Sequence, residues 1–118
     1  MTFEKGIKGF ATIMGITPEY MARELADKAD IIGANCGHGI YEMIDLVPHF
    51  KEAPYIWIKP NAGSPVMKNG EVVYTQTPSE MAGFVPAIVN AGAKVIGGCC
   101  GTTPEHIMEF RKALGKNT

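Results

Sequence analysis

Four short apolar runs alternate with four longer segments of helical periodicity, and this alternation constrains the fold more than any other feature of the chain. The apolar runs cover residues 7–14, 30–34, 55–59 and 94–96, and the helical segments cover residues 18–29, 40–50, 78–91 and 104–114. The runs are bounded by Gly, Asn or Pro, as buried parallel strands are. Repeated strand–helix units predict a parallel sheet with right-handed crossovers. We therefore expect an α/β fold of four βα units with parallel strands, in a single domain over residues 1–118.

Three of the four helical segments start with the same dipeptide, at Thr17-Pro18, Thr77-Pro78 and Thr103-Pro104. A Thr side chain at the N-cap can accept a hydrogen bond from a free backbone N–H, and Pro at the first helical position needs no donor. Glu80 lies three residues after Thr77, which fits a capping box. His106, in the first turn of the last segment, is expected to pack or to cap.

Pro48 and Pro86 lie inside two of the helical segments, so we expect a kink or an early end of the helix at each of them. Asn69-Gly70 separates two short apolar runs in the connection that follows residue 60, and this dipeptide is a strong hairpin signal. Tyr74, after the expected hairpin, is predicted to be a packed aromatic residue, with covering the functional site as the other reading. The chain should therefore contain a hairpin beside its parallel sheet.

The composition excludes several classes of protein. The 118 residues include 11 Lys and Arg against 12 Asp and Glu, a net charge of −1, and no basic run of the kind that binds nucleic acid. A hydrophobic fraction of 46% is too high for a disordered chain. Every apolar stretch is shorter than the roughly 20 residues that cross a bilayer. The first residues hold no cleavable apolar segment, so we expect a cytoplasmic protein with no nucleic-acid or membrane partner.

The three cysteines indicate where the chemistry takes place. Cys36 follows the second apolar run, and Cys99 and Cys100 follow the fourth. Because the carboxyl ends of parallel strands share one edge of a sheet, all three thiols should reach the same rim, with Asn61 on the strand between them. Glycines on both sides of the adjacent pair leave little bulk for core packing and let the backbone turn. A metal site is the favoured interpretation, with buried core cysteines or a redox pair as alternatives.

Three thiolates are soft ligands, and zinc is the metal that fits them best. Three protein ligands leave the fourth position of a tetrahedral zinc open, as in catalytic sites. Zn²⁺ with three thiolates carries a charge of 2 − 3 = −1, which suits it poorly to polarising a carbonyl. A thiol that binds as a fourth thiolate has a lowered pKa and stays nucleophilic at neutral pH. If a metal is present, the ligand set predicts thiol alkylation.

Three motifs, in this order, carry a resemblance to a known family. They are Gly-Ala-Asn-Cys-Gly at residues 33–37, Lys-Pro-Asn-Ala-Gly-Ser-Pro at 59–65 and Val-Ile-Gly-Gly-Cys-Cys-Gly-Thr-Thr-Pro-Glu-His-Ile at 95–107. Together they resemble the homocysteine S-methyltransferase family. The resemblance covers nearly the whole chain but only the C-terminal half of that family's barrel, strands five to eight. It implies half of a TIM-type (β/α)8 barrel, without the N-terminal half that helps to hold the substrate.

The resemblance also implies the roles of particular residues. The implied zinc ligands are Cys36, Cys99 and Cys100. Asn61 is implied to sit beside the metal, where its amide can occupy the open position until substrate arrives. The predicted substrate-binding residues are Asn35, Asn61, Gly98 and Thr102. Thr102 lies just before a helix N-terminus, where a carboxylate can bind.

We therefore predict a zinc-dependent S-methyltransferase-type domain, in which homocysteine or a similar thiol binds as a zinc thiolate and attacks a methyl donor. The donor is betaine-like, a sulfonium or a corrinoid protein. The alternative is a non-catalytic zinc-binding module, or a subunit or fragment that needs another chain. A four-stranded half barrel exposes both sheet edges and one apolar face, so we expect a homodimer or a complementing half-barrel chain.

Overall fold

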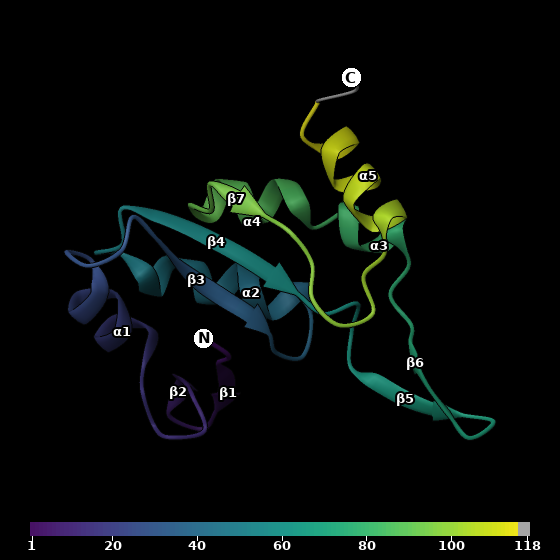
Figure 1. Ribbon diagram of the computed structural model, residues 1–118, viewed down its shortest axis with the longest axis horizontal. Helices are drawn as coiled ribbons and strands as arrows, with labels where there is room; N and C mark the ends of the chain where they lie inside the picture. The colour runs from purple at the N-terminus through teal and green to yellow at the C-terminus, as the bar shows by residue number, and fades with distance from the viewer. Residues whose placement is uncertain (116–118) are drawn as a thin grey trace.

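A parallel sheet of three strands forms the centre of the fold (Figure 1). The computed structural model describes residues 1–115 of the chain. The strands are β3 (Ile31–Cys36), β4 (Tyr55–Pro60) and β7 (Val95–Ile96), in the order β3-β4-β7. Ile31 pairs with Tyr55 and Trp57 pairs with Val95, so the carboxyl ends of the three strands lie at one edge of the sheet. Three of the four predicted strands are thus confirmed.

The helices connect the strands. They are α1 (Pro18–Leu25) before β3, α2 (Ile40–Leu46) and the 3-10 helix η1 (Val47–Phe50) after β3, α3 (Pro78–Ala82) and α4 (Val85–Ala91) before β7, and α5 (Pro104–Ala113) after β7. Both breaks expected at proline are confirmed, because α2 gives way to η1 at Pro48 and α4 starts anew with Pro86 in its first turn. Pro lacks the N–H that a helix interior needs, but it is tolerated in a first turn. None of the helices within residues 1–115 is long and apolar enough to cross a membrane.

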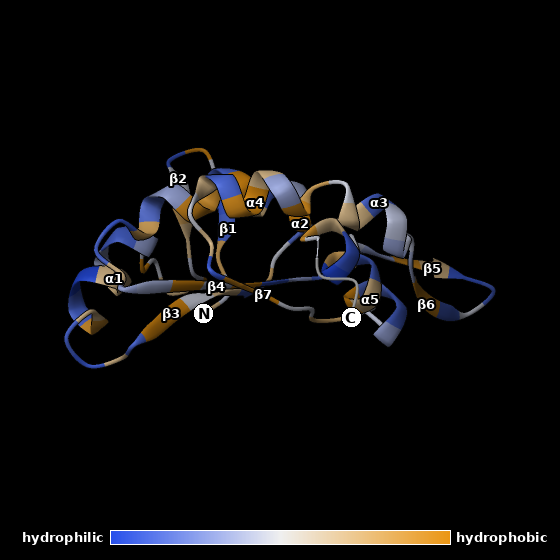
Figure 2. Ribbon diagram, turned by 90° about the horizontal axis from the view of Figure 1, so that it is seen from above, coloured by the Kyte–Doolittle hydropathy of each residue, from blue (hydrophilic) through white to orange (hydrophobic). Residues whose placement is uncertain are grey.

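The two faces of the sheet differ in burial. Ile32 and Ile58 are at most 5% exposed, whereas Trp57, which lies beside Ile58 on β4, is 41% exposed. Consecutive strand residues point to opposite faces, so one face is buried and the other is open. Figure 2 shows α2 and α4 together on one side of the sheet. We call the opposite side the uncovered face, which is formed by Ile31, Tyr55 and Trp57. A parallel sheet with helices on a single face is compatible with half of a barrel.

The hydrophobic core lies between the sheet and the helices. Its completely buried side chains include Leu46, Val47 and Phe50 from α2 and η1, Val85 and Ile88 from α4, and Ile58 from β4. These residues come from segments that the helical and strand periodicities assigned to the interior. The core therefore fixes the helical layer against the same three strands that end at the cysteines.

The predicted strand at residues 7–14 is wrong. This segment belongs to a hairpin in which β1 (Glu4–Gly6) pairs antiparallel with β2 (Gly9–Ala11). Ile7, in the turn, is fully exposed, and Ile13 is 98% exposed. Gly9 and Gly15 have φ values of 102° and 83°. Glycine adopts these left-handed conformations readily, and Gly9 within the run and Gly15 just after it turn the chain before a long strand can form.

The place beside β3 is taken instead by the backbone of Met1. The Met1 amino group donates to the Gly33 carbonyl (3.2 Å), and the Met1 carbonyl accepts from the Asn35 N–H (3.0 Å). These two hydrogen bonds flank Ala34, and this is the hydrogen-bond pattern of neighbouring parallel strands. Among the described residues the parallel sheet therefore has three strands, and the expectation of four βα units is not confirmed.

The hairpin predicted at Asn69-Gly70 is confirmed. β5 (Pro65–Lys68) pairs antiparallel with β6 (Glu71–Tyr74), and the two residues of the turn have φ values of 52° and 80°. Positive φ at both positions is what a type I′ turn requires, and its twist matches that of the flanking strands. This hairpin lies beyond the carboxyl end of β4 (Figure 1).

The predicted N-caps at the starts of α1 and α3 are also confirmed. Thr17 Oγ1 accepts a hydrogen bond from the Tyr20 N–H (3.2 Å). At α3, the Glu80 N–H donates to Thr77 Oγ1 (3.3 Å), and the Thr77 N–H donates to the Glu80 carboxylate (3.1 Å). This reciprocal pair is a capping box, and it satisfies two backbone donors that the helix itself cannot use.

A matched pair of isoleucine substitutions tests the difference between the two faces. Ile58→Ala should lower the free energy of unfolding by about 2–5 kcal/mol, because it leaves a cavity in the core. Ile31→Ala, on the uncovered face, should cost about 1 kcal/mol or less. Urea unfolding followed by circular dichroism measures both values. Equal losses for the two variants would contradict the one-sided core.

Candidate metal centre

Three loops meet at the carboxyl edge of the sheet. β3 ends at Cys36, and Cys99 and Cys100 follow β7 after two glycines. The segment after β4 runs between them and is bonded to the β7 loop. The Cys99 N–H donates to the Pro60 carbonyl (2.9 Å), and the Ala62 N–H donates to the Cys100 carbonyl (2.9 Å). Parallel pairing therefore continues past the strands and holds the loops together at the position of the cysteines.

The three cysteine sulfurs form one cluster. Cys36 Sγ and Cys99 Sγ are 2.8 Å apart, Cys99 Sγ and Cys100 Sγ are 4.0 Å apart, and all three sulfurs lie within 4.8 Å of one another. All three are free thiols; Cys36 and Cys99 are half-buried and Cys100 is exposed. Sulfurs bound to a tetrahedral zinc at about 2.3 Å lie about 3.8 Å from each other. The observed spacing brackets that value, so the cluster fits a zinc ion held by three thiolates.

Cys36 has a strained backbone. Its φ is 61° and that of Gly37 is 70°, so two consecutive residues adopt the left-handed conformation. A residue with a Cβ adopts this conformation at a cost of about 1–2 kcal/mol. The turn ends β3 at the residue whose sulfur contacts Cys99, so the strain lies at the cluster.

Asn61 joins the two loops that carry the cysteines. It is only 7% exposed. Its Nδ2 donates to the Gly37 carbonyl (3.0 Å), and its Oδ1 accepts from the Cys100 N–H (3.0 Å). One carboxamide thus bridges the loop after β3 and the loop after β7. Asn61 lies at the cluster as expected, but in this structure both ends of its amide are bonded to backbone groups.

The other predicted substrate-binding residues lie in the same loops. Asn35 Nδ2 donates to Cys36 Sγ (3.5 Å), and Thr102 Oγ1 donates to the Cys99 carbonyl (2.7 Å). A Cβ added to Gly98 would overlap the Thr102 side chain, so glycine is required for this close approach. The contacts that these residues make are with the cysteines and their loops, and their contact with substrate stays a prediction.

The contact between Cys36 and Cys99 shifts the pKa of both thiols. Hydrogen bonding to Cys99, followed by burial, raises the pKa of Cys36 to about 11. Burial opposes ionisation of Cys99 as well, but hydrogen bonds from Cys36 and Cys100 lower the pKa of Cys99 below its ordinary value. Three thiols this close cannot all ionise without a cation, and a bound metal supplies that charge.

His106 has the structural role that was predicted for it. It is 5% exposed, and its Nδ1 accepts a hydrogen bond from the Thr103 N–H (3.1 Å). Its Nε2 lies 2.9 Å from the Gln76 carbonyl, to which it must donate. The ring therefore caps α5 and ties it to the segment before α3. This partnership spans 30 residues, and no local sequence signal predicts it.

The contact between Gly101 and Tyr74 is a feature that the sequence motifs did not predict. Gly101 follows the two adjacent cysteines and has a φ of 81°. A Cβ added there would lie 2.7 Å from Cδ2 of Tyr74, closer than side chains pack. Burial, and then the charge of Cys100, raise the pKa of the Tyr74 hydroxyl. The last residue of the β5–β6 hairpin thus lies against the cysteine loop.

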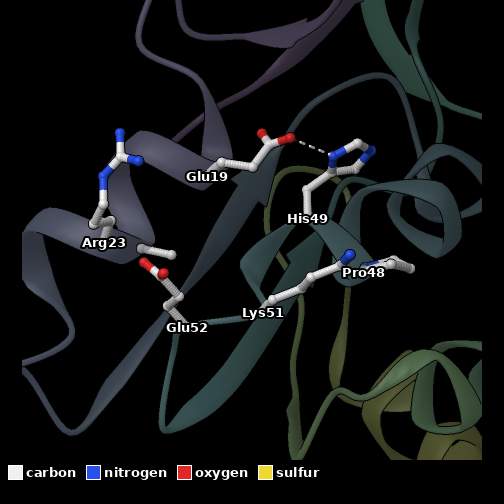
Figure 3. A pocket seen from close by; sticks show the side chains of 7 residues that line it. Glu19, Arg23, Pro48, His49, Lys51 and Glu52 are labelled. Carbon is white, nitrogen blue, oxygen red and sulfur yellow. Dashed lines mark hydrogen bonds and ion pairs between the residues drawn. The ribbon is translucent and has the colours of Figure 1, made fainter.

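A pocket of about 430 Å³ lies away from the cysteines, between α1 and η1 (Figure 3). Its lining includes Glu19 and His49, which point toward each other with Oε2 and Nδ1 2.9 Å apart, and both side chains are exposed to solvent. Hydrogen bonding to His49 lowers the pKa of Glu19. The pocket shares no residue with the loops after the strands, and its mixed exposed charges fit a solvated groove between helices. The cysteine cluster is therefore the candidate site.

Comparison with known proteins identifies the family. Residues 1–114 match the family model described as homocysteine S-methyltransferase. A methionine synthase of Mycobacterium leprae is 38% identical over 90 residues, which are 74% of this chain and 8% of that protein. A methionine synthase of Mycobacterium tuberculosis is 39% identical over 88 residues, which are 72% of this chain and 7% of that protein. The chain belongs to the homocysteine S-methyltransferase family, as its motifs predicted, and it spans less than a tenth of the length of these two relatives.

Removal of the Asn61 carboxamide tests its role in holding the loops. Asn61→Ala should lower the free energy of unfolding by about 1–3 kcal/mol, because the Cys100 N–H and the Gly37 carbonyl lose their partner. Asn90→Ala, on the exposed side of α4, is the matched control and should change stability by about 0.5 kcal/mol or less. Urea unfolding of both variants gives the comparison. A loss for Asn61→Ala no larger than the control's would contradict a bridging role.

Proposed function

We propose that this chain binds the acceptor thiol of a methyl transfer, homocysteine or a close analogue, at a zinc ion held by Cys36, Cys99 and Cys100. The observation that carries the proposal is the convergence of the three sulfurs to within 4.8 Å at the carboxyl edge of the sheet. Membership of the homocysteine S-methyltransferase family supports the choice of substrate. The soft thiolate set supports the choice of zinc over harder-ligand metals.

The chain's own residues prepare the site for a fourth ligand. The three thiols release their protons when they bind a cation, and Asn61 keeps the two cysteine-bearing loops at a fixed separation. When bound, zinc supplies the positive charge that lowers the pKa of an incoming thiol and leaves it a good nucleophile at neutral pH. Cys100 is the exposed member of the cluster, which supports substrate approach from its side. A reducing cytoplasm is the compartment that we propose, because it keeps the cysteines available as thiols.

Substrate contacts are proposed for the residues that surround the sulfurs, namely Asn35, Asn61, Gly98 and Thr102. Their support is their place in the three loops and their hydrogen bonds to the cysteines. The methyl donor must approach in line with the acceptor sulfur, because displacement at a methyl carbon requires that alignment. A corrinoid protein, a betaine-like ammonium or a sulfonium each presents a methyl group of this kind.

The uncovered face favours a second candidate, in which this chain acts as one half of a larger assembly. Ile31, Tyr55 and Trp57 leave apolar area open on a sheet that within residues 1–115 is covered from one side only. We propose that a complementing half barrel covers this face, supplied by a second copy of the chain or by another polypeptide. Without that half, the chain would be a non-catalytic zinc-binding module.

Zinc content tests the ligand set. The full chain should bind one zinc ion, and Cys36→Ser, Cys99→Ser and Cys100→Ser should each lose stoichiometric zinc, because two thiolates do not complete the site. His38→Ala, two residues from Cys36, is the matched control and should keep full occupancy. Elemental analysis after dialysis measures all five proteins. Full occupancy in any cysteine variant would count against the proposed site.

Sedimentation tests the complementing half. A chain of 12.7 kDa whose uncovered face is buried by a second copy should sediment as a dimer. Trp57→Lys should shift it toward the monomer, since a charge is costly in an apolar interface. A stable monomer would rule out self-association, and a monomer that also binds zinc and ignores homocysteine would favour the non-catalytic module.

A further inference from the structure

Tyr74 is held against the cysteine loop by the backbone as well as by its own ring. The Gln76 N–H, two residues after Tyr74, donates to the Ala62 carbonyl (3.1 Å), and the Ala62 N–H donates to the Cys100 carbonyl (2.9 Å). A chain of two backbone hydrogen bonds therefore connects the end of the β5–β6 hairpin to a proposed zinc ligand. The hairpin is tied to the rim of the sheet, although its turn projects away from it (Figure 1).

The ring of Tyr74 occupies space that only glycine leaves free. Gly101 has the left-handed φ that favours glycine, and an added Cβ would overlap the Tyr74 side chain. The ring thus lies directly on the backbone next to Cys100. The hairpin register also fixes the position of Tyr74, which pairs with Pro65 at the end of β6. Both constraints hold the aromatic side chain beside Cys100, the exposed member of the cluster.

The side chain of Tyr74 lies beside the residue that follows Cys100, because its Cβ, Cγ and Cδ2 atoms fill the space next to the Gly101 backbone. The backbone bonds from Gln76 to Ala62 and from Ala62 to Cys100 hold this side chain next to the loop that carries Cys100. A phenol at neutral pH carries its proton, and toward a thiolate it can only donate. Cys100 also lies in the exposed part of the cluster, where water competes for its sulfur.

We propose that Tyr74 is a positioning residue of the metal centre, whose hydroxyl donates a hydrogen bond to the Cys100 sulfur while its ring is seated on Gly101. This inference rests on the proposed function, because it needs Cys100 to be a metal ligand. The hydrogen bond draws charge from the most exposed of the three thiolates. It therefore keeps Cys100 bound to the cation and makes it a weaker nucleophile than an incoming thiol. The site then alkylates its substrate in preference to its own ligand.

A pair of Tyr→Phe variants of the full chain tests this role. Tyr74→Phe keeps the ring and removes only the hydroxyl, so it should weaken zinc binding by about tenfold, the lower end of the effect of losing a hydrogen-bond partner of a metal ligand. Tyr20→Phe, at an exposed position on α1, is the matched control and should bind zinc as the parent chain does. Competition with a chromophoric chelator measures the affinities.

Cobalt substitution gives a readout that is independent of activity. In the Co²⁺-loaded protein, loss of the hydrogen bond should shift the sulfur-to-cobalt charge-transfer band to longer wavelength in Tyr74→Phe and leave it in place in Tyr20→Phe. Gly101→Ala, which displaces the ring but keeps the hydroxyl, should shift the band in the same direction as Tyr74→Phe. Parent-like affinity and spectrum in Tyr74→Phe would overturn this inference and leave the proposed function intact. Failure of the unaltered chain to bind either metal would overturn both.

Discussion

The parallel pairing of β3, β4 and β7 is the constraint on which the rest of the structure depends. It brings the ends of three strands to one edge and so places Cys36, which is 63 residues from Cys99, in contact with it. The pairing extends past the strands through the bonds of Cys99 to Pro60 and of Ala62 to Cys100. Since these are backbone interactions within a sheet held by a fully buried core, the loops have little freedom to separate. The cluster is therefore a product of the fold.

Polar contacts around the sulfurs, in addition to the sheet pairing, fix the position of the cysteine loops. The carboxamide of Asn61 donates to the loop after β3 and accepts from the loop after β7, so one side chain links the two loops. Cys36 adopts a left-handed conformation, which is strained for a residue with a Cβ. A buried amide and a strained cysteine at one place indicate that the surrounding structure determines the position of the sulfurs. This is the arrangement expected of a site that is organised before its ligand arrives.

Local signals in the sequence predicted local structure well. The N-caps at Thr17 and Thr77, the breaks at Pro48 and Pro86 and the turn at Asn69-Gly70 depend on residues a few positions apart, and each was predicted correctly. The run at residues 7–14 was predicted wrongly because its apolar composition does not reveal that Gly9 within it and Gly15 just after it adopt positive φ. The segment forms a hairpin, and the backbone of Met1 occupies the edge of β3 where a fourth strand would pair. Local sequence patterns do not predict either feature.

The sequence predicted that the three cysteines would cluster, but it did not predict the geometry of the cluster. The three cysteines could be assigned to one rim because parallel strands share an edge, and the family motifs named the same residues. Cys36 has a strained backbone conformation that no sequence signature predicts. The amide of Asn61 and the ring of Tyr74 contact residues that lie far away in the sequence. Long-range contacts of this kind can be read only from the folded chain.

The most direct test of this account is X-ray absorption at the zinc edge, on the metal-loaded chain before and after homocysteine is added. The account predicts three sulfur neighbours and one lighter neighbour around zinc in the free protein, and four sulfur neighbours with homocysteine. Fewer than three sulfurs from the protein, or a coordination shell that homocysteine leaves unchanged, would contradict the claim that three cysteines hold a metal with a position open to a thiol.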